Sequence, residues 1–328
     1  ANLESTKYAA KAATDGGLST TGYEVGSDLA LGPKVFPDNW VKIPGNSSFG
    51  TSDFYVMKYE AKCASASNNA LLTTPATIYN TLWDSSSTPA SACTAANSKY
   101  VTSAADGFPL TYVTHNTAKT YCTSIGAHLL TNEEYMTIAR NAEQVAGNWS
   151  TSVGSGYLYS GHNDNTPATA LTASQDDANG YYGTSNASGN QRRALTLSNG
   201  QTVWDLAGNI WEHVQRTAAD IVTAIDLPAC SDGVAGWGYC QYGATTAPYV
   251  SAYTADVAQA AVGPSNTDWN STQGMGQVYS YKNGTDQATT VFIRGGGWNN
   301  GSYAGAFTLG LSWGTGDADF GVGFRCAR

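Results

Sequence analysis

The chain has 328 residues, 41% of them hydrophobic, enough for one large domain or two small ones with a real core. Only 12% of the residues are charged, about half the ~25% usual in globular proteins, so surface polarity must come from Ser, Thr, Asn and Gly. This composition is typical of secreted, cell-surface or virion proteins. The net charge of -9 argues against a nucleic-acid partner, because phosphates require clusters of Lys and Arg. No apolar run approaches the ~18 residues of a membrane span.

The first part of the chain contains an arm, a pair of strands and an insertion. Residues 1–36 show no core pattern, and we expect them to form an N-terminal arm before a domain that covers residues 37–328. The stretches 40–45 (WVKIPG) and 53–63 (DFYVMKYEAKC) alternate as strands do, and they predict an opening pair. Residues 64–106 have the composition of a loop and are interpreted as an insertion.

Residues 108–147 predict two helices in succession. Asn116 can cap the first helix, and Gly126, a residue suited to the left-handed conformation, ends it. The capping-box pattern from Thr131 to Glu134 opens the second. Helical spacing places two sets of side chains inward: Ala118, Tyr121, Cys122 and Ile125 on the first helix, and Tyr135, Ile138 and Ala139 on the second.

A turn and a core strand are expected near residues 203–215, VWDLAGNIWEHVQ. Gly208 and Asn209 break the chain there, and Ile210, Trp211 and Val214 supply apolar side chains after the break. Residues 147–200 before it are rich in loop formers. Residues 216–288 after it are rich in Gly, Ala, Thr and Tyr and are interpreted as a second insertion.

The last stretch, residues 291–328 (here called the tail), has three apolar anchors at 291–293, 307–311 and 322–324. Phe307, Leu309 and Leu311 alternate with small residues, the period-two pattern of a half-buried strand. The residues between the anchors are small, polar or aromatic and follow no period. The pattern indicates a rigid frame that carries freely chosen positions, which suits recognition better than chemistry.

The motifs RGG-x-W, AGAF-x-L-x-L and GFRCAR in the tail resemble the variable region of diversity-generating retroelement proteins. Those proteins have a C-type lectin fold of the formylglycine-generating-enzyme (sulfatase-modifying factor) type. The opening strands, the YC-x-x-x-G helix and the GNIWE turn resemble the same enzyme family. The resemblance implies an α+β chain with two helices, a small mixed or antiparallel sheet, long loop insertions at about 64–106 and 216–288, and a variable region at about 294–328.

In such retroelement systems template adenines are mutagenised during reverse transcription, so asparagine codons become codons for many residues. The resemblance therefore implies a non-catalytic, receptor-like protein that binds varied ligands through a diversified surface. Trp313 departs from the pattern, because an asparagine codon cannot become a tryptophan codon in this way. The implied ligand-binding positions are Gly297, Asn299, Asn300, Tyr303, Gly310, Ser312, Trp313, Gly314, Thr315, Asp317, Asp319 and Phe320.

Six cysteines, an even number and none in a CxxC motif, fit an oxidising compartment. Cys230 and Cys240 flank a glycine-rich loop that they can close, and Cys63 and Cys93 bracket the first insertion. These two local pairs leave Cys122 and Cys326. The alternative to disulfide bonding is that all six cysteines are buried free thiols. The C-type lectin resemblance implies the pair Cys122–Cys326, because a cysteine of the first helix commonly bonds one of the last strand in that fold.

The alternatives to a non-catalytic protein are a formylglycine-generating-type oxidase and a related non-haem iron enzyme. Formylglycine-generating enzymes oxidise a substrate cysteine with a cysteine pair after the RGG motif, but residues 298–304 contain no cysteine. The histidines 115, 128, 162 and 213 are scattered, which disfavours the non-haem iron alternative, and we expect no enzyme. The resemblance allows a structural calcium at Asn209, Ile210 and Glu212, whose oxygens suit that ion; the other interpretation is that Glu212 caps backbone amides. No other cofactor is expected.

The expected partner is a protein or glycan ligand on another cell or virus surface. A carbohydrate-binding lectin is the second alternative, although the EPN or QPD loop of calcium-dependent lectins is absent from the sequence. We expect an extracellular, cell-surface or virion-displayed monomer with no transmembrane segment in this chain.

Overall fold

The computed structural model describes residues 39–65, 93, 99–173, 190–217, 219, 222–243, 248–283 and 287–328. The predicted arm at 1–36 and most of the insertion at 64–106 lie outside these residues. The segment Asn39–Arg328 forms one compact unit.

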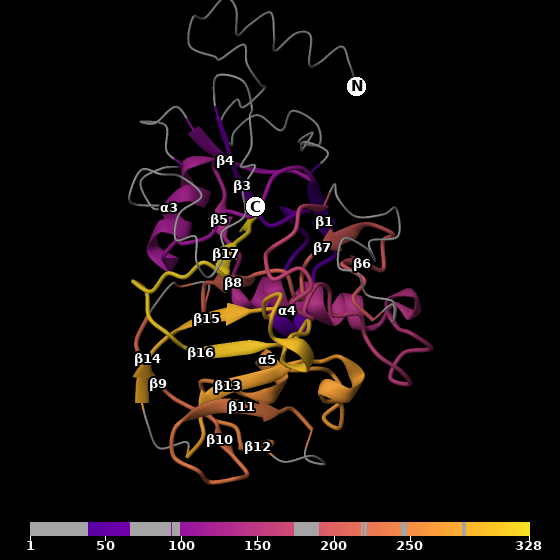
Figure 1. Ribbon diagram of the computed structural model, residues 1–328, viewed down its shortest axis with the longest axis vertical. Coiled ribbons are helices and arrows are strands. Elements are labelled where there is room, and N and C mark those ends of the chain that lie inside the picture. Colours follow the sequence, from indigo (N-terminus) through magenta and orange to yellow (C-terminus); the bar gives the residue numbers. More distant parts are fainter. Residues whose placement is uncertain are drawn as a thin grey trace, which may run out of the picture. The chain divides into compact units, whose positions relative to one another are not determined.

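The largest sheet has six strands in the order β11-β13-β16-β15-β8-β17. Its pairs β13/β16 and β17/β8 are parallel and the others are antiparallel. Figure 1 shows β15, β16, β13 and β11 one beneath another. The bounds are β11 Trp237–Gln241, β13 Gln277–Tyr281, β16 Leu309–Trp313, β15 Val291–Arg294, β8 Trp211–Val214 and β17 Val322–Phe324.

A second sheet, antiparallel throughout, joins the two ends of the unit in the order β1-β2-β18-β5. The predicted opening pair is thus present, and the last strand of the chain lies beside it. The bounds are β1 Trp40–Ile43, β2 Phe54–Met57, β18 Cys326–Ala327 and β5 His128–Leu129. Two-stranded sheets pair β3 (Ala61–Ser65) with β4 (Lys99–Ser103), β6 (Ala194–Thr196) with β7 (Thr202–Trp204), β9 (Ala224–Asp226) with β14 (Gln287–Thr289), and β10 (Ala229–Cys230) with β12 (Val250–Ala252).

The two predicted helices are α3 (His115–Ser124) and α4 (Asn132–Glu143), and α5 (Gln259–Val262) adds one further turn. The side chain of Thr114, not Asn116, caps α3, because its hydroxyl accepts the N–H of Thr117. The predicted capping box of α4 is present between Thr131 and Glu134. Short 3-10 turns occur at Ser47–Phe49, Ala146–Asn148, Ser271–Gln273 and Gly301–Tyr303.

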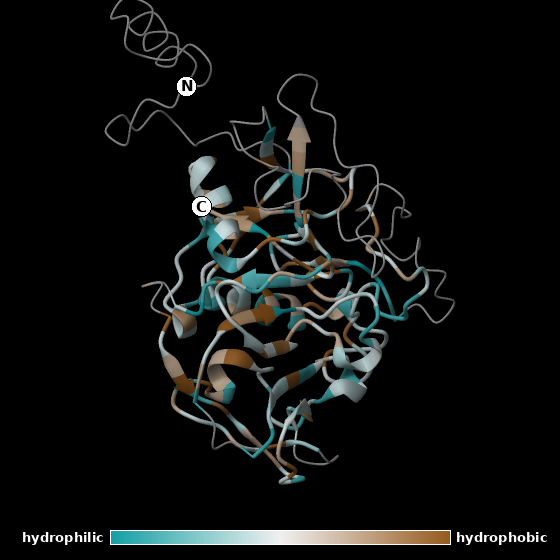
Figure 2. Cartoon of the chain, turned by 60° about the vertical axis from the view of Figure 1, so that its left-hand side comes forward, coloured by the Kyte–Doolittle hydropathy of each residue, from teal (hydrophilic) through white to brown (hydrophobic). Residues whose placement is uncertain are grey.

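The hydrophobic core lies between the six-stranded sheet and α4. Phe307, Leu309 and Leu311 of the tail are fully buried there, and Tyr135 and Ile138 of α4 pack into the same cluster. Figure 2 shows hydrophobic residues, in brown, on several strands and helices in the middle of the unit. The predicted α+β class and its C-type lectin arrangement are confirmed: two main helices, a mixed sheet, and a last strand, β18, that pairs with β2 of the opening pair.

The segment 216–288, predicted to be a loop insertion, contributes strands to the domain. It contains β9 to β13, and two of these strands, β11 and β13, extend the large sheet beyond the tail strand β16. The sequence does not reveal these strands, because the repeated Gly and Thr of the segment are typical of loops. The tail therefore packs against a neighbouring strand that the insertion supplies.

Three disulfides use all six cysteines: Cys63–Cys93, Cys122–Cys326 and Cys230–Cys240. These are the three pairs that the sequence analysis names. Cys122 lies on α3 and Cys326 on β18, with Cα atoms 5.4 Å apart and a sequence separation of 204. This bond ties the end of the tail to the first helix.

Candidate ligand-binding site

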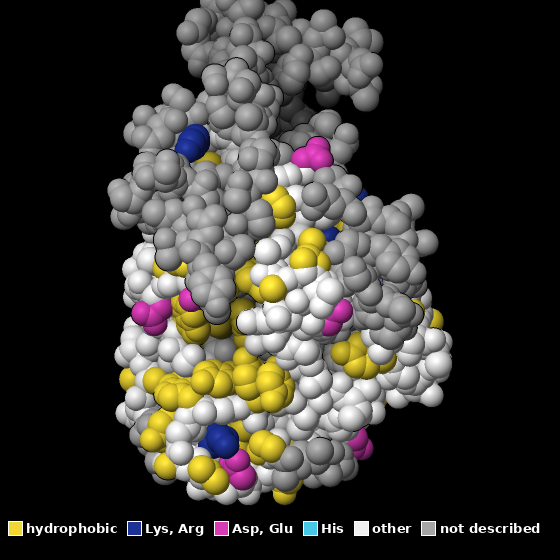
Figure 3. Space-filling view, in the orientation of Figure 1, with side chains coloured by type: hydrophobic (Ala, Val, Ile, Leu, Met, Phe, Trp, Pro, Cys, Tyr) yellow, Lys and Arg dark blue, Asp and Glu magenta, His cyan; other side chains and the backbone are white. Residues whose placement is uncertain are grey.

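A pocket of about 290 Å³ opens on the six-stranded sheet. Figure 3 shows hydrophobic side chains gathered in a band over this part of the molecule, beside a hollow. Six of the lining residues are aromatic, and the polar side chains among them are few. The lining residues are Trp211, Tyr239, Tyr279, Ile293, Gly297, Trp298, Asn299, Gly310, Ser312, Trp313, Asp319, Phe320, Gly321 and Val322.

The alternation of β16 creates the floor of the pocket. Leu309 and Leu311 are fully buried in the core on one face of the sheet, while Gly310 and Ser312 line the pocket on the other. Gly310 is also closely packed, because a Cβ there would lie 2.6 Å from Cγ1 of Ile293. The expectation that Gly310 is a freely replaceable surface position is therefore wrong.

One wall of the pocket is the turn that follows β15. Gly295 and Gly296 have φ of +85° and +80°, a conformation in which side chains are strained, so the RGG motif needs glycine there. The N–H of Trp298 donates to the carbonyl of Asn209 (3.0 Å), and the Asn300 side-chain oxygen accepts the N–H of Gly297 (2.7 Å). These bonds fix the turn before any ligand arrives.

The opposite wall is the loop between β16 and β17. Asp317 accepts the N–H of Gly314 (2.7 Å) and Asp319 accepts the N–H of Gly321 (2.9 Å), so two carboxylates brace the loop. Phe320 packs against Trp298, with ring centroids 5.7 Å apart. Partial burial raises the pKa of Asp319, although its bond from Gly321 acts in the opposite direction.

The structure brings seven of the twelve predicted ligand-binding positions together around the pocket: Gly297, Asn299, Gly310, Ser312, Trp313, Asp319 and Phe320. Asn300 and Tyr303 lie beside it and contact Tyr239, through a 3.3 Å hydrogen bond and a ring stack of 4.2 Å respectively. Gly314, Thr315 and Asp317 follow β16 in the loop and do not line the pocket. Gly297 and Gly310 are buried, and the other ten positions are at least partly exposed.

Four aromatic lining residues were missed as site residues: Trp211, Tyr239, Tyr279 and Trp298. Tyr239 and Tyr279 belong to an aromatic row of Trp237, Tyr279, Tyr239 and Tyr303, in which each ring lies 4.2–5.9 Å from the next. The sequence does contain a signal for this aromatic row, because aromatic residues alternate with other residues in both 237–239 and 279–281. It marks two strands that share an aromatic face.

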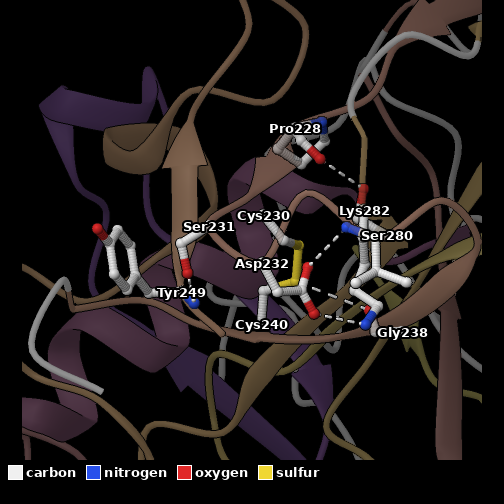
Figure 4. The surroundings of a disulfide bond; sticks show 10 residues. Pro228, Cys230, Ser231, Asp232, Gly238, Cys240, Tyr249, Ser280 and Lys282 are labelled. Atoms are coloured by element: carbon white, nitrogen blue, oxygen red, sulfur yellow. Dashed lines mark hydrogen bonds and ion pairs between the residues drawn. A yellow bond between two sulfur atoms is a disulfide. The ribbon is translucent and has the colours of Figure 1, made fainter. Parts of the chain in front are cut away.

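The disulfide Cys230–Cys240 holds the strand that carries Tyr239. Figure 4 shows it surrounded by polar contacts: the Ser280 hydroxyl donates to the Pro228 carbonyl (2.9 Å), and Lys282 pairs with Asp232 (2.7 Å). Cys240 is the residue next to Tyr239 and is fully buried. The aromatic row therefore rests on a covalently fixed edge of the sheet.

Two of the three residues named for calcium, Glu212 and Asn209, have oxygens that accept hydrogen bonds from protein donors in this structure. Both oxygens of Glu212 accept from the Arg325 guanidinium (2.9 and 2.7 Å from Nε), and both residues are buried. The Asn209 carbonyl accepts from Trp298, and its side-chain oxygen accepts the N–H of Leu171 (2.7 Å). The backbone N–H of Ile210 donates to Glu60. Protein donors therefore already contact the Glu212 carboxylate and both Asn209 oxygens, and Glu212 pairs with a guanidinium rather than capping backbone amides.

The described pocket lining contains no histidine or cysteine, although the ring of His213 lies edge-on to that of the lining residue Trp313, with centroids 5.9 Å apart. His115 and His213 pack together with ring centroids 5.9 Å apart, His128 bonds Glu134 (2.9 Å), and His162 lies 3.0 Å from the Thr169 carbonyl. Cys326, the cysteine of the tail, is bonded to Cys122. Within the described residues no group of three or more His, Cys, Asp or Glu is placed to hold a metal ion.

The described helices fall short of the length and hydrophobicity that crossing a bilayer requires.

Comparison with known proteins gives one family. The model of the sulfatase-modifying factor enzyme 1-like domain matches residues 18–328. No curated protein sequence matches the chain. Among solved structures, the Major Tropism Determinant I1 variant has 15% identity and a TM-score of 0.38 over 89% of this chain and 53% of its own, so this chain spans about half its length. The Treponema denticola variable protein 1 has 12% identity and a TM-score of 0.33, over 88% of this chain and 93% of its own.

Proposed function

The chain belongs to the sulfatase-modifying factor enzyme 1-like domain family, and we propose that within it this protein is a non-catalytic receptor whose tail surface binds varied ligands. The observation that carries the proposal is the shared location of seven predicted variable positions around one aromatic pocket. Aromatic side chains among small polar ones give a large contact area at low entropic cost.

The rigidity of the site supports the same proposal. The apolar anchors of the tail are buried, and the disulfide Cys122–Cys326 fixes the end of the tail. The disulfide Cys230–Cys240 fixes β11, the strand that carries Tyr239. Substitutions at the rim of such a pocket leave the core contacts unchanged. A frame of this kind suits diversification by a retroelement, in which many sequences must share one fold.

The enzyme alternative of the family is disfavoured by the state of the cysteines. The family's enzymes need a reactive cysteine in the thiolate form, which is the nucleophile and metal ligand, whereas all six cysteines here are in disulfides. We propose display on a cell or virion surface, because three disulfides fit an oxidising environment.

Display of two variant libraries tests the binding proposal. The first library randomises five predicted positions that line the pocket and are at least partly exposed: Asn299, Ser312, Trp313, Asp319 and Phe320. The matched control randomises five exposed positions that do not line the pocket: Ser48, Ser124, Asn199, Ser251 and Thr289. Selection against a panel of purified surface proteins and glycans should yield specific binders from the first library only. Equal yields from both libraries, or none from the first, would contradict the proposal.

Two further measurements address the mechanism. The DNA beside the gene should contain a near-copy of the tail sequence that differs only at adenines, together with a reverse transcriptase gene. The purified protein should leave a cysteine-containing peptide unchanged in mass after aerobic incubation. Conversion of that cysteine to an aldehyde would establish the enzyme instead.

A further inference from the structure

The pocket combines many aromatic faces with one charge. Three tryptophans, two tyrosines and a phenylalanine line it, and Asp319 is the one charged residue among the described lining residues. No lysine, arginine or histidine appears in that described lining. Aromatic faces carry negative electrostatic potential, so rings and carboxylate act in the same direction.

Asp319 is placed to receive a cation. One carboxylate oxygen, Oδ1, accepts the N–H of Gly321 (2.9 Å), which fixes the side chain at the edge of the pocket beside Phe320. The side chain is only partly exposed, so water solvates the carboxylate incompletely. A cation that enters the pocket would replace the missing solvation, whereas a neutral group would leave the carboxylate poorly compensated.

We propose that the pocket binds the cationic side chain of a protein ligand, an arginine or a lysine, between its aromatic walls and Asp319. This inference rests on the proposed binding function and names the chemistry that the present tail sequence recognises. A guanidinium stacks on aromatic faces and also donates to a carboxylate, so both features of the pocket are used at once. A sugar would stack on the ring faces and donate a hydroxyl to the carboxylate, but it would bring no positive charge to balance that of Asp319. The overall charge of -9 also favours a basic partner.

The test uses a small probe with a neutral counterpart. N-acetyl-arginine methylamide is titrated into the full chain at pH 8, and tryptophan fluorescence is recorded because Trp211, Trp298 and Trp313 line the pocket. N-acetyl-citrulline methylamide has nearly the same shape without the charge. We expect saturable quenching by the arginine probe and binding about tenfold weaker or more for the citrulline probe.

Two matched aspartates separate the local effect from the overall charge. Asp319 and Asp317 both accept a backbone N–H of the same loop, but only Asp319 lines the pocket. Asp319→Asn keeps an acceptor oxygen and should lower affinity for the arginine probe about tenfold, with little change for citrulline. Asp317→Asn should change affinity less than about twofold, as expected for an exposed charge. Asp319→Glu should restore part of the preference for arginine.

Equal affinity for the arginine and citrulline probes would overturn the inference, and so would equal losses in the two asparagine variants. Saturable quenching by methyl glucoside without any by arginine would overturn it in favour of a sugar. The library selection remains an independent measurement. Binders from the tail library together with equal probe affinities would refute the cation site while leaving the proposed function intact.

Discussion

The disulfide Cys122–Cys326 should be the largest single covalent contribution to the stability of the frame that carries the variable positions. The double substitution Cys122→Ala and Cys326→Ala opens a loop with a sequence separation of 204. In the chain-entropy model a cross-link lowers the unfolded-state entropy by about 2.1 + 1.5R ln n cal/mol/K. For a separation of 204 this amounts to about 5 kcal/mol at 25 °C.

Cys230–Cys240 provides the matched control. Its sequence separation is 10, for which the same model gives about 2.7 kcal/mol. Cysteines of both pairs are buried, between 0% and 4% exposed, so replacement by alanine removes similar packing in the two double variants. The difference of about 2–3 kcal/mol between the variants therefore measures the effect of loop length.

The assay is unfolding in guanidinium chloride under non-reducing conditions, followed by tryptophan fluorescence and extrapolated to water. The variant without Cys122–Cys326 should lose more free energy of unfolding than the variant without Cys230–Cys240. Equal losses, or a larger loss for the short loop, would refute the argument that the long cross-link stabilises by restricting the unfolded chain. Peptide mapping must show the remaining disulfides intact in both variants.

Leu309→Ala should cost about 2–5 kcal/mol by leaving a core cavity, whereas Asn299→Ala, at an exposed position, should change stability by less than about 0.5 kcal/mol; equal shifts in thermal melts would contradict the division into frame and surface. Gly310→Ala should cost about 1–3 kcal/mol, because its Cβ would meet Ile293, and an unchanged melting temperature would count against that contact. Burial and the neighbouring His115 lower the pKa of His213 to about 3. The unfolded state therefore binds a proton first as the pH falls below about 6.5, so stability should decrease by up to about 1.4 kcal/mol per pH unit between there and pH 3. Chemical unfolding at pH 7 and pH 5 should show a smaller decrease in His213→Gln than in the parent, and equal decreases would refute the assignment.

Local signals in the sequence were enough to predict the main elements. The period-two pattern of Phe307, Leu309 and Leu311 predicts which side chains enter the core, and all three are buried. The capping box from Thr131 to Glu134 predicts the start of α4, because the bonds that satisfy a helix terminus lie within four residues. The cap of α3 was assigned to Asn116 instead of Thr114 because several residues of that stretch can cap a helix.

Contacts between distant parts of the chain depended on the tertiary structure. Glu212 has oxygens that suit calcium, but Arg325, 113 residues later, occupies them. The predicted variable positions share a surface because β16 lies between β15 and β13, and the parallel pairing with β13 places Tyr279 beside Gly310. A sequence period fixes which face of a strand a residue occupies. It does not fix which strand lies next, because strand order depends on how the whole chain closes over its core.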